Sequence, residues 1–320
     1  MQANNIDEPI LSALFKGVLE PHALSQKLGL PAEIILHGIE SLQQLGYIIE
    51  RTPYSGFILK SSPDVIIADE IRARLPGNVF ARQLAVYRQT RSTNDIVFKA
   101  GNEGAAEGFA VLAEMQTHAR GRKHRVWHAP AGNGIWLSLL FRPDWPLERA
   151  SFLTYMAGVA LCRSVFRLTG LRCGIKWPND ILLSGKKLAG ILTETRGSGT
   201  RLEFAVAGIG CNFRNRREDF PGDLRERATS LVLEGASPEL RRADLLVALL
   251  QEIETLYRLS WPAVHAEWTT LCLSIGKPVR VQTEARLLEG LMTGLEEDGS
   301  LLLRMPSGKI EVINSGEVLF

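Results

Sequence analysis

Residues 176–192 constrain the fold of this chain more strongly than any other stretch, and they read KWPNDILLSGKKLAGIL. Pro178 has no backbone N–H and restricts the residue before it to extended geometry, so the chain must bend there. Ser184-Gly185 has the composition of a hairpin turn. The stretch therefore predicts a strand, a polar corner and a β-hairpin. A tight turn with satisfied polar groups would account for Asn179-Asp180 alone. A partly buried lysine, however, needs an anionic or carbonyl partner, which favours a binding site at Lys176.

The length and composition are those of a globular protein with more than one domain. The chain has 320 residues, of which 45% are hydrophobic and 22% are charged. Its net charge of +2 is too small to indicate nucleic acid or a membrane as a partner. Residues 1–8 are polar and acidic, unlike a signal peptide, and no apolar run is long enough to span a bilayer. The four cysteines include no Cys-x-x-Cys pair, so we expect reduced thiols in a cytoplasmic protein, with neither disulfides nor a zinc site: Cys162, Cys173, Cys211 and Cys272.

The first 60 residues predict a small helical unit with a β-hairpin. Apolar residues at helical spacing predict a helix over Pro9–Leu19, and two short helices on either side of Gly29 fit a helix-turn-helix at about residues 20–39. Residues 46–52 and 56–59 alternate like the strands of a hairpin. This order is typical of a winged helix-turn-helix, although a three-helix interaction module that never touches DNA would show the same pattern.

The rest of the chain alternates helices with strands and then changes to strands alone. After a linker at 61–64, we expect helices at 68–74, from Ser92, and at 150–168, 239–259 and 262–273. Strands are expected at 84–88, 109–115, 134–141, 172–176, 187–195 and 202–211, and an irregular, partly helical segment at 216–235. Five short strands follow at 278–282, 287–295, 300–305, 309–313 and 317–320, with a turn at Asp298-Gly299. These patterns predict a mixed α/β domain followed by a small β-barrel.

Three further motifs place polar groups or glycines at the ends of predicted elements. Ser92-Thr93-Asn94-Asp95 opens a helix, where Ser92 is a suitable N-cap and where polar groups of a ligand are commonly held. Residues 117–127 follow a strand and hold four basic residues between 120 and 125. Such a run is usually a solvated loop, and nucleic-acid binding is the next interpretation. Residues 208–212, read GIGCN, end a buried strand, and glycines there allow a ligand close to the backbone.

The sequence argues against several other kinds of catalytic site. Residues 185–187 and 276–278 lack the spacing and the hydroxyl of a Walker A loop, and there is no Gly-x-Ser-x-Gly elbow. His124 and His128 are four residues apart, but Pro130 and the loop composition argue against a helical metal pair. We therefore expect a mechanism that depends on positioning and on stabilising developing charge.

Together, the motifs at 92–94, 117–127, 176–192 and 208–212 resemble those of bacterial biotin protein ligases of the long, repressor–ligase type. The resemblance covers about residues 84–320, and reaches 6–60 through domain order. It implies an α+β protein with a winged helix-turn-helix at 1–62, a biotin/lipoate-ligase-type catalytic domain at 63–274 and an SH3-like β-barrel at 275–320. The chain departs from the family pattern where Ala119 and His124 replace glycines, and where it stops at Phe320, so that a nucleotide contact from a longer tail is missing or supplied elsewhere.

The resemblance also assigns site residues, and Lys176 is the expected catalytic residue. Biotin is expected to contact Ser92, Thr93, Asn94, Gln116, Arg120, Gly121, Arg122, Lys176, Gly190, Gly208 and Gly210. The nucleotide is expected to contact Arg122, Arg125, Trp127, Asn179, Lys187 and Asn212, and Asp180 is the candidate ligand for Mg2+.

The implied reaction is an ATP-dependent ligation of biotin to a lysine of the biotin carboxyl-carrier protein of acetyl-CoA carboxylase, through biotinyl-5′-AMP. ATP and biotin are the expected substrates, and a homodimer is expected on ligand binding, with no membrane partner. Two alternatives stay open: a lipoate or octanoyl ligase, and a ligand-sensing transcription regulator without ligase activity.

Operator DNA is the expected second partner, bound weakly. Residues 1–60 hold six acidic and four basic residues, a balance of 4 − 6 = −2, and residues 31–45 contain no Lys or Arg. Because phosphate contacts supply most non-specific affinity, the binding should rest on a few residues and on a ligand-driven dimer: Lys27, His37, Arg51 and Lys60.

Overall fold

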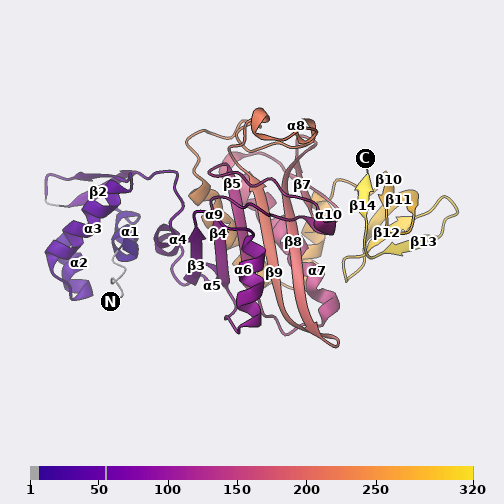
Figure 1. The fold of residues 1–320 in the computed structure, drawn as a ribbon, viewed down its shortest axis with the longest axis horizontal. Helices are drawn as coiled ribbons and strands as arrows, with labels where there is room; N and C mark the ends of the chain where they lie inside the picture. The colour runs from indigo at the N-terminus through magenta and orange to yellow at the C-terminus, as the bar shows by residue number, and fades with distance from the viewer. Residues whose placement is uncertain (1–6, 55, 320) are drawn as a thin grey trace.

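The computed structural model describes residues 7–54 and 56–319, in which three β-sheets follow one another along an elongated molecule (Figure 1). A two-stranded sheet lies at the N-terminal end, a seven-stranded sheet in the middle and a five-stranded sheet at the C-terminal end. Residues 1–6, 55 and 320 lie outside the described residues, and with them most of the polar N-terminal segment and the last residue of the strand expected at 317–320. No helix in the described ranges is long and apolar enough to cross a membrane.

The described N-terminal unit contains α1 (Asp7–Leu14), α2 (Pro21–Leu28), α3 (Ala32–Gln44), β1 (Ile48–Arg51) and β2 (Phe57–Ser61). Gly29 ends α2 in the left-handed conformation, with a φ of 66°, which accounts for the turn between the two predicted short helices. The expected helix Pro9–Leu19 is wrong at its C-terminal end. Gly17 has a φ of 140°, and Leu19 lies beyond it in a β-bridge with Phe57.

The middle sheet has the strand order β3-β4-β5-β9-β8-β7-β6; β3 and β4 are parallel and the other neighbours are antiparallel. Its strands are β3 (Gln83–Tyr87), β4 (Phe109–Ala113), β5 (Gly134–Phe141), β6 (Gly174–Lys176), β7 (Asp180–Leu183), β8 (Lys186–Ser198) and β9 (Arg201–Asn212). Alternate side chains of these strands enter two different cores. Helices α7 (Ser151–Thr169), α9 (Arg242–Tyr257) and α10 (Trp261–Leu271) cover one face, and α6 (Thr93–Asn102) covers the other (Figure 1).

The C-terminal sheet contains β10 (Pro278–Gln282), β11 (Leu287–Leu295), β12 (Leu301–Arg304), β13 (Ile310–Ile313) and β14 (Glu317–Leu319), in the order β13-β12-β11-β10-β14. The five predicted strands are therefore present within one or two residues at each end. Two hydrogen bonds link this sheet to α7 and to the polar corner of the middle sheet. The Tyr155 hydroxyl and Trp177 Nε1 both donate to the carbonyl oxygen of Gly299, at 2.7 and 3.2 Å. Gly299 has a φ of 86° and lies so close to Tyr155 that a side chain would collide with the ring.

Short helices connect these parts: α4 (Ala68–Arg74), α5 (Val79–Arg82), α8 (Leu224–Arg227) and the 3-10 turns at Arg122–His124, Leu147–Ala150 and Arg217–Asp219. The segment expected as a linker is anchored to the middle of the molecule. Asp64 forms ion pairs with Arg214 and Arg242, and Ile66 is buried in the main core. The N-terminal unit is thus held close to the middle sheet by a packed segment.

Candidate active site

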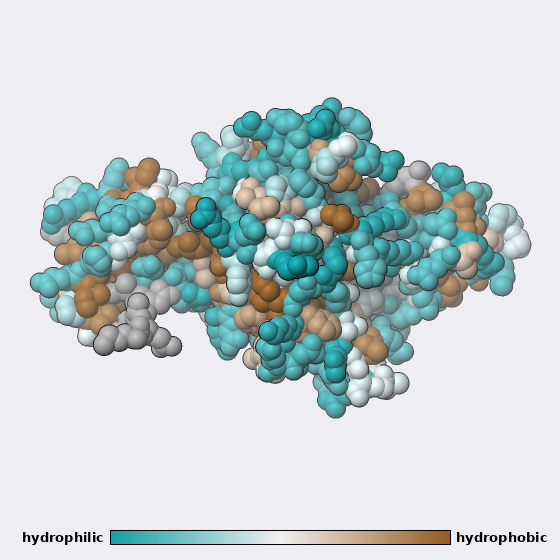
Figure 2. Space-filling model, viewed as in Figure 1, coloured by the Kyte–Doolittle hydropathy of each residue, from teal (hydrophilic) through white to brown (hydrophobic). Residues whose placement is uncertain are grey.

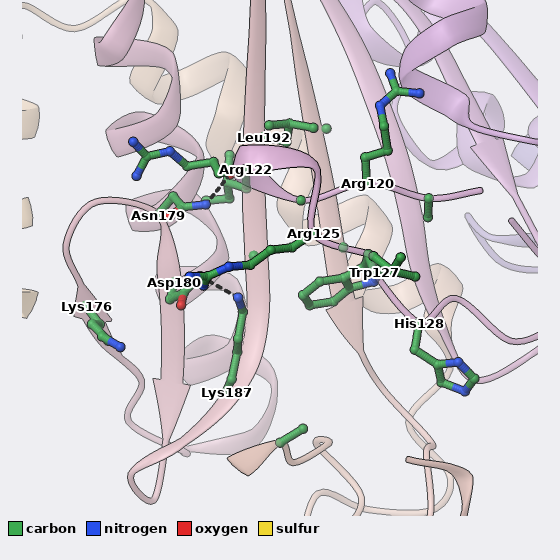
Figure 3. A pocket seen from close by; sticks show the side chains of 18 of the residues that line it. Arg120, Arg122, Arg125, Trp127, His128, Lys176, Asn179, Asp180, Lys187 and Leu192 are labelled. Atoms are coloured by element: carbon green, nitrogen blue, oxygen red, sulfur yellow. Dashed lines mark hydrogen bonds and ion pairs between the residues drawn. The ribbon is translucent and has the colours of Figure 1, made fainter. Parts of the chain in front are cut away.

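A cavity of about 770 Å³ opens between the middle sheet, the loop 117–127 and the C-terminal sheet (Figure 3). All the residues that the sequence assigned to biotin, nucleotide or Mg2+ line it: Ser92, Thr93, Asn94, Gln116, Arg120, Gly121, Arg122, Arg125, Trp127, Lys176, Asn179, Asp180, Lys187, Gly190, Gly208, Gly210 and Asn212. The fold therefore brings them together, while their individual roles remain predictions. Lys27, His37, Arg51 and Lys60 are absent from the lining and belong to the N-terminal unit.

The first turn of α6 forms one wall of the cavity. The side chain of Ser92 accepts from the N–H of Asp95 at 3.4 Å and so caps the helix, as the sequence predicted. The N–H and the hydroxyl of Thr93 both contact Oε1 of Gln116, at 2.7 and 3.1 Å. Because the carbonyl oxygen of Gln116 is held by α6, a ligand would meet its amide N–H donors.

A buried polar network fixes Asn94 beside this wall. Asn94 donates to Glu194 at 2.7 Å, and the hydroxyl of Ser138, fully buried on β5, contacts Asn94 Oδ1 at 2.5 Å and Thr93 Oγ1 at 2.7 Å. Gly208 leaves the necessary space, since a Cβ on it would lie 2.2 Å from Asn94 Oδ1. Ser138 and Glu194 were not among the predicted site residues. Ser138 carried a usable signal, because it is the one polar residue in the apolar strand 134–141.

Trp127 lies across the pair of glycines at the centre of the cavity. Gly190 and Gly210 are opposite each other on β8 and β9, and a Cβ on them would meet the indole at 3.1 and 2.7 Å. The ammonium of Lys187 lies 5.4 Å from the indole centroid and 2.7 Å from Asp180 Oδ1 (Figure 3). The corner that carries Asp180 is held by Asn179, whose side chain donates to the carbonyl of Ile191 at 2.7 Å.

The arginines of the loop have protein partners in this structure. Arg120 forms a two-pronged contact with Asp95, at 3.0 and 2.5 Å, and lies 3.5 Å from Glu194. The hydrogen bond with Asp95 raises the pKa of Arg120. Arg122 donates to the Gly316 carbonyl at 3.3 Å, and burial lowers its pKa. The loop is thus tied to α6 on one side and to the C-terminal sheet on the other.

Two of the loop residues replace glycines of the family pattern, and they behave differently. Ala119 is 5% exposed and lies in a small apolar cluster with Ala129 and Trp136. Ala119 therefore gives the loop an apolar anchor before Val126. His124 has a φ of 58°, in the left-handed region, where a non-glycine residue costs roughly 1–2 kcal/mol.

The C-terminal sheet contributes residues to the cavity that were not among the predicted site residues. Arg280, Gly316, Glu317 and Leu319 line the cavity. Glu317 Oε2 accepts from Arg125 at 2.6 Å, and its Oε1 lies 4.0 Å from the ammonium of Lys176. The hydrogen bond from Arg125 lowers the pKa of Glu317. A carboxylate of this sheet thus faces the cationic groups of the cavity. The available signal was the Gly316-Glu317 dipeptide, which places a carboxylate just before the end of the chain.

A second wall that was not predicted comes from the segment after β9. The sequence predicted an irregular, partly helical segment there, and α8 and the 3-10 turn Arg217–Asp219 confirm its helical part. Its lining residues are Phe220, Leu224, Glu226, Arg227 and Ala228. The segment is connected to the strand beneath, since Asn212, 4% exposed, donates to the carbonyl of Thr229 at 3.0 Å. The region around α8 at the top of the molecule presents a mainly hydrophilic surface (Figure 2).

The cavity could supply a metal ion with only a few ligands. In residues 7–54 and 56–319, no group of three or more His, Cys, Asp or Glu side chains is arranged to hold a metal. Asp180 lies on the lining, however, and Mg2+ is often bound by one or two carboxylates together with substrate phosphates. The donor set therefore fits a magnesium ion that arrives with a phosphate ligand.

We expect Glu317→Gln to loosen the loop 117–127. The substitution keeps the shape of the side chain and removes the charge that Arg125 contacts, so trypsin should cut between Arg120 and Arg125 about 2- to 5-fold faster, the range for a partly exposed ion pair. Because the pKa of Glu317 is lowered, the pair is intact at neutral pH and is lost as the pH falls through that lowered pKa.

Glu311→Gln is the matched control for this experiment. Glu311 lies in the same sheet and forms an ion pair with Arg286 at 2.8 Å, away from the loop. Its replacement should leave the cleavage rate in the loop unchanged. Equal rates for the wild type and both variants would show that Glu317 does not hold the loop.

Several known proteins are similar to this chain in sequence and in fold. Residues 86–212 match the model of the biotin/lipoate A/B protein ligase family, and residues 274–320 match that of the biotin protein ligase C-terminal domain. The chain is 35% identical over 299 residues to the bifunctional ligase/repressor BirA of Bacillus subtilis, covering 92% of this chain and 91% of that protein. It is 35% identical over 248 residues to the biotin–[acetyl-CoA-carboxylase] ligase of Mycobacterium tuberculosis, covering 74% of this chain and 89% of that protein. The biotin protein ligase of Aquifex aeolicus, solved in complex with biotin and ATP, superposes with a TM-score of 0.61 at 27% identity, covering 74% of this chain and 98% of that one.

Proposed function

The chain belongs to the biotin protein ligase family, and we propose that it joins biotin to a lysine of the biotin carboxyl-carrier protein of acetyl-CoA carboxylase. In the first step the biotin carboxylate attacks the α-phosphate of ATP, which forms biotinyl-5′-AMP and releases pyrophosphate. In the second step the lysine amine attacks the acyl carbon, an amide forms, AMP leaves and the amine gives up a proton. Both steps build negative charge at one centre, so fixed cations there should lower both barriers.

The convergence of the motif residues around one cavity, with Lys176 at its corner, is the observation that carries this proposal. Lys176 lies beside the carboxylate of Glu317, so an anionic group fits next to its ammonium. We assign Lys176 to the charge that develops on the α-phosphate and then on the acyl carbon. Thr93 and Gln116 would bind the polar ring of biotin, and the glycines of β8 and β9 would admit it close to the sheet.

For the nucleotide we assign cationic and aromatic groups that line the same cavity. Arg122, Arg125 and Lys187 would face the phosphates, and Trp127 offers an aromatic surface to a base. Mg2+, with Asp180 as a protein ligand, would neutralise phosphate charge when bound with ATP. Because Asp180 contacts Lys187 at 2.7 Å, loading the nucleotide should rearrange this pair.

Transfer of labelled biotin to a carrier domain tests the function and separates it from the alternatives. We expect incorporation that depends on ATP and on the acceptor lysine, and little or none with labelled lipoate or octanoate. Preferential incorporation of lipoate or octanoate would indicate the lipoate or octanoyl ligase. Binding of biotin with neither pyrophosphate release nor transfer would indicate a ligand sensor without ligase activity.

A repressor role is the second part of the proposal. The match to the Bacillus subtilis protein covers 92% of the chain and must therefore include part of residues 1–62. We propose that α1, α2, α3 and the β1/β2 hairpin form a winged helix-turn-helix at 1–62, followed by a catalytic domain at 63–274 and an SH3-like barrel at 275–320. A ligand-driven homodimer would bring two such units to one operator. The four free cysteines agree with a cytoplasmic protein.

DNA binding should be weak and dependent on ligand. On α3, His37 lies 3.8 Å from Glu40, and in the hairpin Lys60 lies 3.7 Å from Glu50, so carboxylates offset two of the four expected contacts. Exposed apolar residues also occur on this unit, including Ile34 at 43% and Ile48 at 54%. Phosphate affinity would then come chiefly from Lys27, Arg51 and dimer avidity.

A gel-shift titration with the DNA upstream of the chain's own operon checks this prediction. We expect a shift only with biotin and ATP, and a steep loss of binding as salt is raised. Tight binding without ligand at physiological salt would show that the charge argument is wrong. No shift under either condition would indicate that residues 1–62 form an interaction module.

A further inference from the structure

Two consecutive arginines lie at the start of α9, and the second of them is deeply buried. Arg242 is 3% exposed. A buried guanidinium is costly unless carboxylates and carbonyls satisfy it, so its partners indicate what it holds. Arg242 is absent from the lining of the cavity and takes no direct part in the proposed chemistry.

The partners of Arg242 are a carboxylate at the end of β4 and the segment that leads from the N-terminal unit. Nη1 and Nη2 donate to the two oxygens of Glu114 at 2.6 and 3.3 Å, in the forked geometry that fixes both groups. Nη2 also donates to the carbonyl of Asp64 at 2.8 Å, and the N–H of Arg242 donates to Asp64 Oδ1 at 3.0 Å. The side chain thus clamps Glu114 to α9.

Glu114 is two residues from Gln116, to which we assign the polar ring of biotin. The short segment between them has few ways to move. The Glu114 N–H donates to Tyr87 at 2.8 Å, and the Gln116 N–H donates to Ala129 at 3.1 Å. A shift of the Glu114 side chain would be passed along this segment to Gln116, and then to its contact with Thr93.

Arg241, the residue before, has a different set of partners. It donates to Glu70 at 2.9 Å and to Asp244 at 2.9 Å. Glu70 is fully buried and accepts from the Tyr47 hydroxyl of the N-terminal unit at 2.7 Å. The two adjacent arginines therefore hold different parts of the molecule, and of the two only Arg242 reaches the segment after β4 that carries Gln116.

We propose that Arg242 is a positioning residue for biotin recognition, acting through Glu114 to set the place of Gln116. The inference rests on the proposed function, because it needs Gln116 to contact biotin. It predicts a specific kinetic signature: the affinity for biotin should fall, while the affinity for ATP should change less, because Asp180 and Lys187 lie on β7 and β8.

Steady-state kinetics of biotin-dependent pyrophosphate release test the proposal with Arg242→Met and Arg241→Met in the full chain. We expect Arg242→Met to raise the KM for biotin about tenfold, as for residues that orient a ligand-binding group, with kcat and the KM for ATP changed less than about threefold. Arg241→Met should leave all three within about twofold of the wild type, although both variants lower the melting temperature.

A gentler variant keeps the test decisive if Arg242→Met folds poorly. Glu114→Gln should raise the KM for biotin in the same direction, by a smaller factor. Combined with Arg242→Met, it should add no further increase, because both changes break one clamp. Gln116→Ala should raise the same KM at least as much as Arg242→Met.

The outcomes separate the inference from the proposed function. Equal rises in the KM for biotin in the two arginine variants, or parallel changes in kcat and both KM values, would overturn the positioning role. An unchanged KM in Gln116→Ala would overturn it as well. A wild type that releases no biotin-dependent pyrophosphate would defeat the proposed function, and this inference with it.

Discussion

Lys176→Ala should lower the rate of biotin-dependent pyrophosphate release by about 10²- to 10³-fold, the usual effect of losing one preorganised group that stabilises charge in the transition state. Lys176 ends β6 at the corner of the cavity, where its ammonium lies 4.0 Å from the carboxylate of Glu317. In the proposed reaction this ammonium stabilises the negative charge that grows on the α-phosphate as it is attacked. The loss should therefore appear mainly in kcat, with a smaller change in the KM for biotin.

Lys186→Ala is the matched control for that measurement. Lys186 begins β8 in the neighbouring hairpin and is absent from the lining of the cavity. Its replacement should leave the rate within about twofold, which is the scale of a surface substitution of up to 0.5 kcal/mol. A Lys176→Ala protein that folds normally and releases pyrophosphate within threefold of the wild-type rate would contradict the role assigned to Lys176.

Gly208→Ala should raise the KM for biotin by about 5- to 150-fold, which corresponds to the 1–3 kcal/mol of a disrupted buried hydrogen-bonding group. The added Cβ would lie 2.2 Å from Asn94 Oδ1, and the amide has little room to retreat, because Ser138 and Glu194 both contact it. Asn94 must therefore leave its place at the start of α6. Thr93, the adjacent residue, should be displaced with it.

Gly294→Ala tests whether this effect depends on position. Gly294 also lies within a strand, β11, but a Cβ added there meets no atom within 4 Å. We expect that variant to have wild-type kinetics and near-wild-type thermal stability. If Gly208→Ala kept the wild-type KM for biotin, the network around Asn94 would have no part in binding.

Local chemistry allowed much of the fold to be predicted from the sequence. The alternation of apolar residues indicated the strands of the middle and C-terminal sheets, and the Ser92 motif indicated the start of α6. The end of α1 was placed wrongly for a tertiary reason. Residues up to Leu19 kept a helical pattern, but Leu19 is bound to Phe57, which lies 38 residues further along the chain.

Some parts of the candidate site could likewise be predicted from the sequence, and others could not. Four groups could be predicted from the sequence alone: the lysine corner, the basic loop, the helix cap and the glycines at the ends of strands. This was possible because each motif is contiguous, and a turn, a cap or a close approach restricts the residue types at neighbouring positions.

Which of these groups contact one another depends on how the sheets and helices pack. Arg120 is held by Asp95 and Glu194, and Glu317 reaches Arg125 and Lys176 from a strand at the far end of the chain. Arg242 clamps a carboxylate 128 residues before it. Hydrophobic periodicity indicates which face of a helix or strand is buried, but it does not identify the element that packs against that face. Such pairs form only when the sheets and helices have packed, since their energy depends on distance and burial.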